Sequence, residues 1–296
     1  MKYLLAVLIF FLVLFIYIHI QYHLKTNGDL EIYNIENPSK DKFEEICDLR
    51  QPVLIKLELS EILNNCNLAA LNDNYGAFDI KIRNNDDKRE NSEKHLPLLL
   101  NEAVNLFQKD NENKLITENN EDFLVETGAI KHYKYNDVFL RPPMVSKCTY
   151  DFWSGSNGSI TPLRYNNNYR NYLYITSGKI KLKLIPPNYS KYLNIKKDYE
   201  NGEFCSNINP WDVKPQDSAD FNKVKVLDIT LNDGDLLYIP AYWIYSIKYE
   251  EISSISVFCY RTYMNTVAII PDLIMQFLQK QNIERKFLKP LDLKVG

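Results

Sequence analysis

The sequence predicts a mainly β domain of the barrel or jelly-roll kind, with flanking helices and an apolar N-terminal segment. Across residues 138–264, short runs rich in Tyr, Ile, Val and Leu alternate with Gly, Pro and Asn breaks. This texture is typical of short strands joined by tight turns. The run "KIKLKLI" alternates strictly, so we expect Ile180, Leu182 and Leu184 to face a core and the lysines to face water. "NDGD" at 232–235 predicts a tight turn between two strands.

The N-terminal segment, "MKYLLAVLIFFLVLFIYIHIQYHLK", carries no charge from Tyr3 to Ile18. Residues 3–22 supply the ~20 residues that are needed to cross a bilayer, and we expect residues 1–24 to form a transmembrane anchor. A cleaved signal peptide is the alternative. It requires small residues soon after the apolar run, whereas "HIQYHLK" offers bulky ones. The expected product is a single-pass membrane protein whose residues 3–22 form one projecting helix.

Residues 25–137 are expected to be the helix and strand part of the globular region. After a polar connector, "DKFEEICDLRQPVLIKL" predicts a short helix and a strand at Pro52–Leu57. "ELSEILNNCNLAAL" has helical spacing, and "GAFDIKI" predicts another strand. "RNNDDKRENSEK" at 83–94 predicts an exposed loop, and "LPLLLNEAVNLFQKD" predicts an amphipathic helix.

Residues 265–296 return to a helical pattern. Leu273, Phe277 and Leu278 share an apolar stripe there, and we expect this stripe to join the core. A dimer contact is the alternative, because proteins that this chain resembles dimerise through C-terminal helices.

Composition limits the classes of protein that need be considered. The chain has 296 residues, 45% of them hydrophobic and 25% charged, which fits one main folded domain. The net charge is −3 and there is no long basic block, so nucleic acid is not an expected partner. The five cysteines form no CxxC pair, so neither a zinc site nor a disulfide framework is indicated.

Three segments, in this order, resemble the cupin-like branch of the jumonji-C family: "FWSGSNGSITPLRYN", "SGKIKLKLIPP" and "LNDGDLLYIPAYWIYSI". The resemblance covers residues 138–263 well, and the earlier region only through "QPVLIK". It implies a double-stranded β-helix. Active members, such as the asparaginyl hydroxylase that inhibits the hypoxia factor, use iron(II) and 2-oxoglutarate. With the Asn-rich composition, the resemblance also leads us to expect a large DNA virus as the source and a host or virion membrane as the location.

The positions that the resemblance assigns to the metal carry no good metal ligands. The family's His-x-Asp after "TPL" is Arg164-Tyr165-Asn166 here, and the distal histidine position holds Tyr245. Non-haem iron oxygenases hold iron with two histidines and one carboxylate. Arg stays charged and offers no lone pair, Asn is a weak neutral donor, and Tyr ligates only when it is ionised. We therefore expect no catalytic residues, no metal and no cofactor.

The cosubstrate site departs from the family in the same way. The resemblance places a lysine that pairs with 2-oxoglutarate at the position of Ile180. Thr161 and Asn171 match polar positions near the cosubstrate in some relatives. The four histidines show no His-x-Asp/Glu spacing: they are His19, His23, His95 and His132.

Two interpretations of Arg164 stay open. In the first, Arg164 pairs with an acid such as Asp235 or Asp151 and plugs a former metal pocket. In the second, a metal-free pocket binds an anion, because guanidinium grips carboxylate or phosphate bidentately. The side chains of that pocket would be Arg164, Tyr165, Arg170 and Tyr245.

These observations favour a membrane-anchored, non-catalytic binding or structural module, with an unknown protein or an anionic small molecule as its partner. One alternative is an oxygenase with an unorthodox site. Others are a metal-free cupin acting on an anionic small molecule and a lectin-like or receptor ectodomain.

Overall fold

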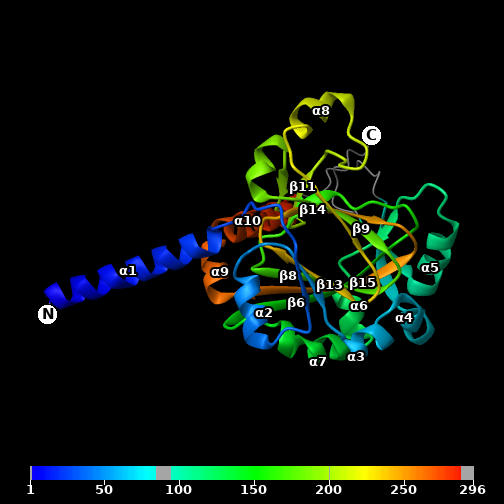
Figure 1. Ribbon diagram of the computed structural model, residues 1–296, viewed down its shortest axis with the longest axis horizontal. Coiled ribbons are helices and arrows are strands. Elements are labelled where there is room, and N and C mark those ends of the chain that lie inside the picture. Colours follow the sequence, from blue (N-terminus) through cyan, green and yellow to red (C-terminus); the bar gives the residue numbers. More distant parts are fainter. Residues whose placement is uncertain (1, 85–94, 200, 288–296) are drawn as a thin grey trace, which may run out of the picture.

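Two β-sheets pack face to face at the centre of the molecule (Figure 1). The computed structural model describes residues 2–84, 95–199 and 201–287. The larger sheet has the spatial order β1 (Tyr33–Glu36), β2 (Val53–Lys56), β13 (Asp235–Pro240), β8 (Arg170–Ser177), β15 (Ser253–Thr262), β6 (Val145–Gly155), β5 (Leu115–Thr117), β3 (Asp79–Asn84) and β4 (Leu96–Leu99). The smaller sheet has the order β10 (Lys196–Asp198), β11 (Glu203–Ser206), β7 (Leu163–Tyr165), β14 (Ile244–Tyr249), β9 (Ile180–Ile185) and β12 (Leu227–Leu231).

Helices cover the outer face of the larger sheet. These are α2 (Lys40–Cys47), α3 (Ser60–Asn65), α4 (Leu68–Tyr75), α5 (Leu100–Lys109), α6 (Glu121–Glu126) and α7 (Ile130–Leu140). The other helices are α1 (Lys2–Leu24), the 3₁₀ helix η1 (Pro187–Tyr192), α8 (Pro215–Phe221), α9 (Tyr263–Ala268) and α10 (Ile270–Phe287).

The larger sheet has an apolar core on each of its two faces, because successive side chains of its strands point to opposite faces. In β8, Leu173 and Ile175 pack between the sheets, while Tyr172 and Tyr174 pack under the helices. Successive side chains of a strand point to opposite faces, so a strand covered on both sides is apolar throughout. In β9, Ile180, Leu182 and Leu184 are fully buried between the sheets, as the alternation predicted.

The tight turn predicted at 232–235 joins β12 to β13. The amide of Asp235 donates to the carbonyl of Asn232 over 3.0 Å. Gly234 has a φ of 78°, a left-handed conformation that glycine adopts without a steric penalty.

The region before residue 138 is continuous with the β core. Strand β2 pairs with β13, and β5 pairs with β6, so both edges of the larger sheet come from this region. The short helix and the strand predicted around "DKFEEICDLRQPVLIKL" are present as α2 and β2.

Two predicted helices differ from the structure. "ELSEILNNCNLAAL" forms two helices, because Asn67 caps a new one by accepting the Ala70 amide over 2.8 Å. "LPLLLNEAVNLFQKD" begins as strand β4, which pairs with β3 at the sheet edge, where Pro97 is tolerated. Of the loop predicted at 83–94, residues 85–94 lie outside the described part of the chain, and Arg83 and Asn84 belong to β3.

The apolar stripe predicted to join the core from the C-terminal helix lies largely at the surface. Phe277 is 62% exposed and Leu278 50% exposed. The face of α10 toward the domain instead carries Asp272, which accepts a hydrogen bond from the Tyr199 hydroxyl over 3.0 Å. The side of α10 that carries Asp272 therefore faces the domain, Leu273 is half-buried, and Phe277 and Leu278 lie outside.

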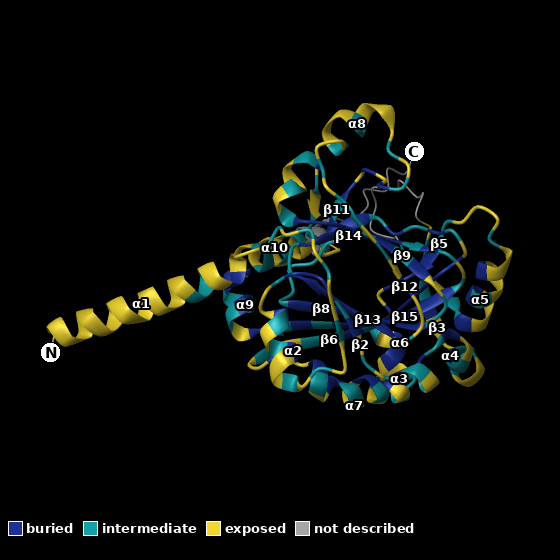
Figure 2. Ribbon diagram, in the orientation of Figure 1, coloured by how far each residue is buried: buried dark blue, intermediate teal, exposed yellow. Residues whose placement is uncertain are grey.

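Helix α1 projects from the globular part as one continuous helix, as predicted (Figures 1 and 2). Leu5, Phe10 and Phe15 are 59%, 61% and 53% exposed, so none of them packs inside the β-domain. The helix is long and apolar enough to cross a membrane, and a signal sequence would satisfy the same criterion.

The last turn of α1 packs against the domain instead of being joined to it only through a linker. His23 is buried, with its Nε2 3.3 Å from the hydroxyl of Thr262 at the start of α9. Its ring lies 5.2 Å from that of Tyr169, and the Arg50 guanidinium lies 4.3 Å from the Tyr22 ring. The end of α1 therefore contacts the domain directly, and the polar connector that follows Lys25 begins after this contact.

Candidate functional site

Arg164, Asn166 and Tyr245 lie together between the sheets. Arg164 is the middle residue of β7 and stands directly opposite Tyr245 of β14 in an antiparallel pair. Asn166 follows β7 immediately, and its amide nitrogen is 3.3 Å from the Tyr245 hydroxyl. The expected clustering of these three residues is confirmed. That they replace the ligands of a former metal centre stays a prediction.

Arg164 forms a buried, bidentate ion pair with Glu118. Its two terminal nitrogens donate to the two carboxylate oxygens over 2.7 and 2.6 Å. The two side chains are only 9% and 1% exposed. The expected ion pair is therefore present, but neither Asp235 nor Asp151 provides the acid.

The two acids named from the sequence have other partners. Asp235 pairs across the larger sheet with Lys56. Asp151 accepts the backbone amides of Asn119 and Asn120 over 2.9 and 2.6 Å, together with the indole N–H of Trp153. Asp151 still acts on the site, because it orients the Trp153 ring, whose centroid lies 4.7 Å from the Arg164 guanidinium.

The electrostatics of the pair keep Arg164 charged and Tyr245 neutral. Burial, the largest single influence, would lower the pKa of Arg164. The charge of Glu118, its hydrogen bonds and the contribution of Tyr245 together outweigh burial and hold the pKa well above its ordinary value. Burial raises the pKa of Tyr245 to about 12, although Arg164 opposes this rise. A neutral phenol and a paired guanidinium both lack an anionic lone pair to offer a cation.

The residues at this site do not fit the iron that the resemblance implies. Arg164 brings a fixed positive charge, and Asn166 and Tyr245 offer only neutral oxygens where iron(II) sites use two histidines and a carboxylate. Within residues 2–84, 95–199 and 201–287, no group of three or more His, Cys, Asp or Glu side chains is placed to hold a metal ion. The position that the resemblance gives to the cosubstrate lysine, Ile180, lies in the apolar core.

The anion pocket expected from four side chains does not assemble. Tyr165 is next to Arg164 in β7 and points to the opposite face, where its ring stacks on Phe204 at 5.0 Å. Arg170 lies on the helical side of β8, where it pairs with Glu44 over 2.7 Å. Of these four residues, all within the described part of the chain, only Arg164 and Tyr245 bring their side chains together.

The two polar residues matched to the cosubstrate site serve the β-sheets. The hydroxyl of Thr161 accepts the amide of Ile247 over 2.8 Å. The side-chain amide of Asn171 donates to the carbonyl of Ile239 over 3.2 Å. Both therefore satisfy backbone groups, which is the usual role of buried polar side chains.

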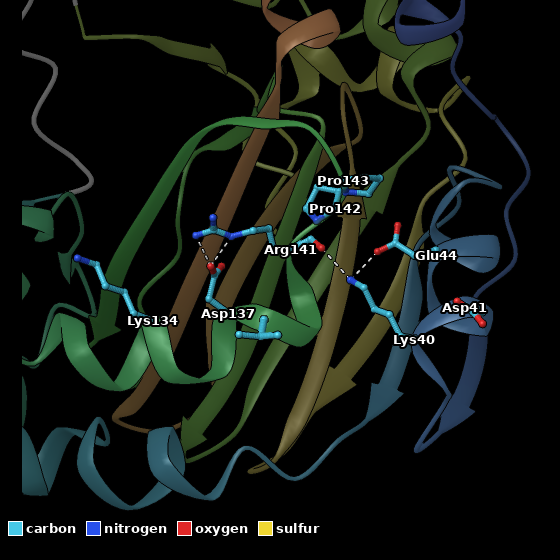
Figure 3. A pocket seen from close by; sticks show the side chains of 9 residues that line it. Lys40, Asp41, Glu44, Lys134, Asp137, Arg141, Pro142 and Pro143 are labelled. Carbon is cyan, nitrogen blue, oxygen red and sulfur yellow. Dashed lines mark hydrogen bonds and ion pairs between the residues drawn. The ribbon is translucent and has the colours of Figure 1, made fainter.

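A separate pocket of about 650 Å³ lies between α2 and α7, on the helical side of the larger sheet (Figure 3). Four of its charged side chains already have partners: Lys40, Glu44, Asp137 and Arg141. Lys40 pairs with Glu44 and donates to the carbonyls of Phe139 and Arg141 over 2.7 Å each. Asp137 pairs with Arg141. This pocket does not reach the Arg164–Glu118 pair.

Sequence reasoning did not name Glu118 or Trp153. Glu118 follows the three-residue strand β5, and it meets Arg164 only because β5 joins β6 in the larger sheet. Nothing local to "LITENNED" signals this contact. The need of a buried arginine for an acid is general, but it does not locate the acid.

The comparison with known families agrees with this architecture. The model of the cupin-like domain family matches residues 39–263, well over half of the chain. The chain therefore belongs to the cupin-like domain family. The match also takes in the helical region from α2 onward, where the sequence resemblance was loose. No curated protein matches the chain.

Proposed function

We infer that the chain is a membrane-anchored cupin-like protein that binds or supports a partner and does not catalyse oxygenation. The observation that carries this proposal is the Arg164–Glu118 pair, buried between the sheets at the place where the resemblance puts the metal. A bidentate pair held between the Trp153 and Tyr245 rings supports a closed interior. In such a pair the guanidinium and the carboxylate satisfy each other, which suits a structural role.

Helix α1 supports the anchoring part of the proposal. Its side chains are apolar on every side and exposed, a pattern that water disfavours and a bilayer accommodates. Because the last turn of α1 docks on α9 through His23, a membrane holding α1 would also hold the domain in one orientation.

Oxygenase activity is the first test. The full chain in detergent micelles, given iron(II), 2-oxoglutarate and oxygen, is expected to release no more succinate than a heat-denatured sample. The same result is expected with a cell extract added as a source of substrates. The reason is that neither the metal positions nor the Ile180 position offers the required ligands. Succinate release that depends on both the folded chain and iron would refute the proposal.

Anchoring is tested by deleting residues 2–22. The full chain is expected to remain in membranes after alkaline extraction, because exposed apolar area of this extent favours the bilayer. The deleted chain keeps His23 and is expected to be soluble, with a cooperative unfolding transition. Mass spectrometry of the full chain provides the control. A mature protein that lacks the first residues and stays soluble would identify the segment as a cleaved signal.

A further inference from the structure

The outer face of the smaller sheet carries a cluster that neither the fold nor the proposed function uses. We name it the lysine–tryptophan face: it consists of Lys181, Lys183, Lys248 and Trp211. The lysines come from β9 and β14, on the side opposite the apolar core. Trp211 reaches the face from the segment between β11 and α8.

Trp211 is held in a fixed orientation above the sheet. Its indole N–H donates to the hydroxyl of Ser246 over 3.0 Å. Ser246 is fully buried, and its hydroxyl donates in turn to the carbonyl of Thr161 over 2.7 Å. Lys183 Nζ lies 5.0 Å and Lys248 Nζ 5.8 Å from the ring centroid. The ring is thus preorganised and flanked by cations.

The lysines of this face are only partly balanced by carboxylates. Lys181 stands directly opposite Lys248 in the antiparallel pair of β9 and β14, an arrangement that destabilises a sheet. Glu250 pairs with Lys181 over 3.0 Å, and Asp228 pairs with Lys183 over 2.9 Å. Within the described residues, Lys248 has no carboxylate partner. A positive excess therefore remains beside the indole ring.

Two of these lysines, Lys181 and Lys248, act on Glu250 together with Lys179. The hydrogen bond from Lys181 lowers the pKa of Glu250, and the charges of Lys248 and Lys179 act in the same direction. One half-buried carboxylate thus lies near three lysines, so the face attracts further negative charge.

A groove of about 310 Å³ opens on this face, and Trp211, Lys181, Lys183, Asp228 and Thr230 all line it. This volume lies at the lower end of the range for small-ligand sites, roughly 300–1,000 Å³. The groove combines an aromatic ring, a hydroxyl, a carboxylate and ammonium groups. A ligand that matches all of these has a flat apolar face, hydroxyl groups and a negative charge.

We propose that the lysine–tryptophan face binds an acidic saccharide, a sugar that carries a carboxylate or sulfate group. One face of the sugar ring stacks on Trp211, and its hydroxyls bond to Asp228 and Thr230. Its anionic group lies between Lys181, which lines the groove, and Lys248, the cross-strand neighbour of Lys181 beside the groove. Asp228 accepts hydrogen bonds from hydroxyl groups, which a sugar ring presents around its edge. This site lies outside the barrel interior and does not depend on the absence of iron there.

The test is calorimetric titration of the full chain in detergent micelles with a sulfated, uronate-containing disaccharide. Maltose and uridine monophosphate serve as neutral and nucleotide comparisons. Trp211→Ala and Lys248→Gln are each expected to weaken binding about tenfold or more, the loss typical of truncating an anchor. Lys223→Gln is the matched control, because Lys223 also lies over an aromatic ring, that of Tyr192 at 5.4 Å, outside the groove. It should leave the affinity unchanged.

The outcomes separate the proposal from its rivals. Saturable binding of the sulfated disaccharide that both variants weaken supports it. Absence of binding at millimolar concentration, tighter binding of the nucleotide, or affinity that survives both variants would each overturn it. The thermal unfolding of Trp211→Ala is measured alongside, and Lys248→Gln decides the question if that variant fails to fold.

Discussion

Glu118→Gln is expected to destabilise the folded chain by about 3–5 kcal/mol, the cost of leaving a buried charge without its partner. Arg164 is 9% exposed and donates both terminal nitrogens to Glu118, so the variant leaves a full positive charge between the sheets. The free energy of unfolding from denaturant titration measures this loss.

Two further variants show whether the charge is the cause. Arg164→Met combined with Glu118→Leu removes both charges, and its unfolding free energy is expected to lie closer to that of the wild type than does that of Glu118→Gln. Asp228→Asn breaks an ion pair whose carboxylate is 65% exposed and should cost less than about 1 kcal/mol. A cost for Glu118→Gln as small as that of Asp228→Asn would show that the pair does not hold the interior together.

Combining Arg164→His, Asn166→Asp and Tyr245→His is expected to create a site for a divalent transition metal, with a Kd at or below ~10 μM. Arg164 and Tyr245 are cross-strand partners, which places their Cβ atoms about 4.5–5.5 Å apart. Asn166 reaches the Tyr245 hydroxyl, so its carboxylate counterpart would meet the same point. Glu118, released from Arg164, supplies a further negative charge nearby.

The matched control keeps the new carboxylate and omits the histidines: Arg164→Gln, Asn166→Asp and Tyr245→Phe. It should bind zinc or cobalt no better than the wild type. Equal metal affinity in the control and in the histidine variant would mean that these three positions do not converge on one ion.

Much of the fold was predictable because its signals are local. The alternation of "KIKLKLI" reports which side of β9 is buried, and "NDGD" specifies a turn that glycine completes at Gly234. The uninterrupted apolar run from Tyr3 to Ile18 gives α1. Each of these depends only on neighbours in the chain.

The candidate site was predicted less well, because its contacts are long-range. Glu118 is 46 residues from Arg164 in sequence, and the pairing of β5 with β6 brings it near. The prediction that Arg164 and Tyr165 share a pocket was wrong, because adjacent residues of a strand face opposite sides of the sheet. The prediction that Arg170 joins this pocket was wrong as well, because Arg170 lies on the helical face of β8 together with Tyr172.

The central claim is that an ion pair closes the space between the two sheets, and the metal content of the wild-type protein tests it most directly. The full chain is equilibrated with iron(II) under anaerobic conditions, freed of unbound ion and measured by elemental mass spectrometry, with the histidine variant as positive control. We expect no stoichiometric iron in the wild type, because Arg164 and Glu118 satisfy each other where a cation would sit. One iron per wild-type chain, lost on Tyr245→Phe or Asn166→Ala, would contradict the account.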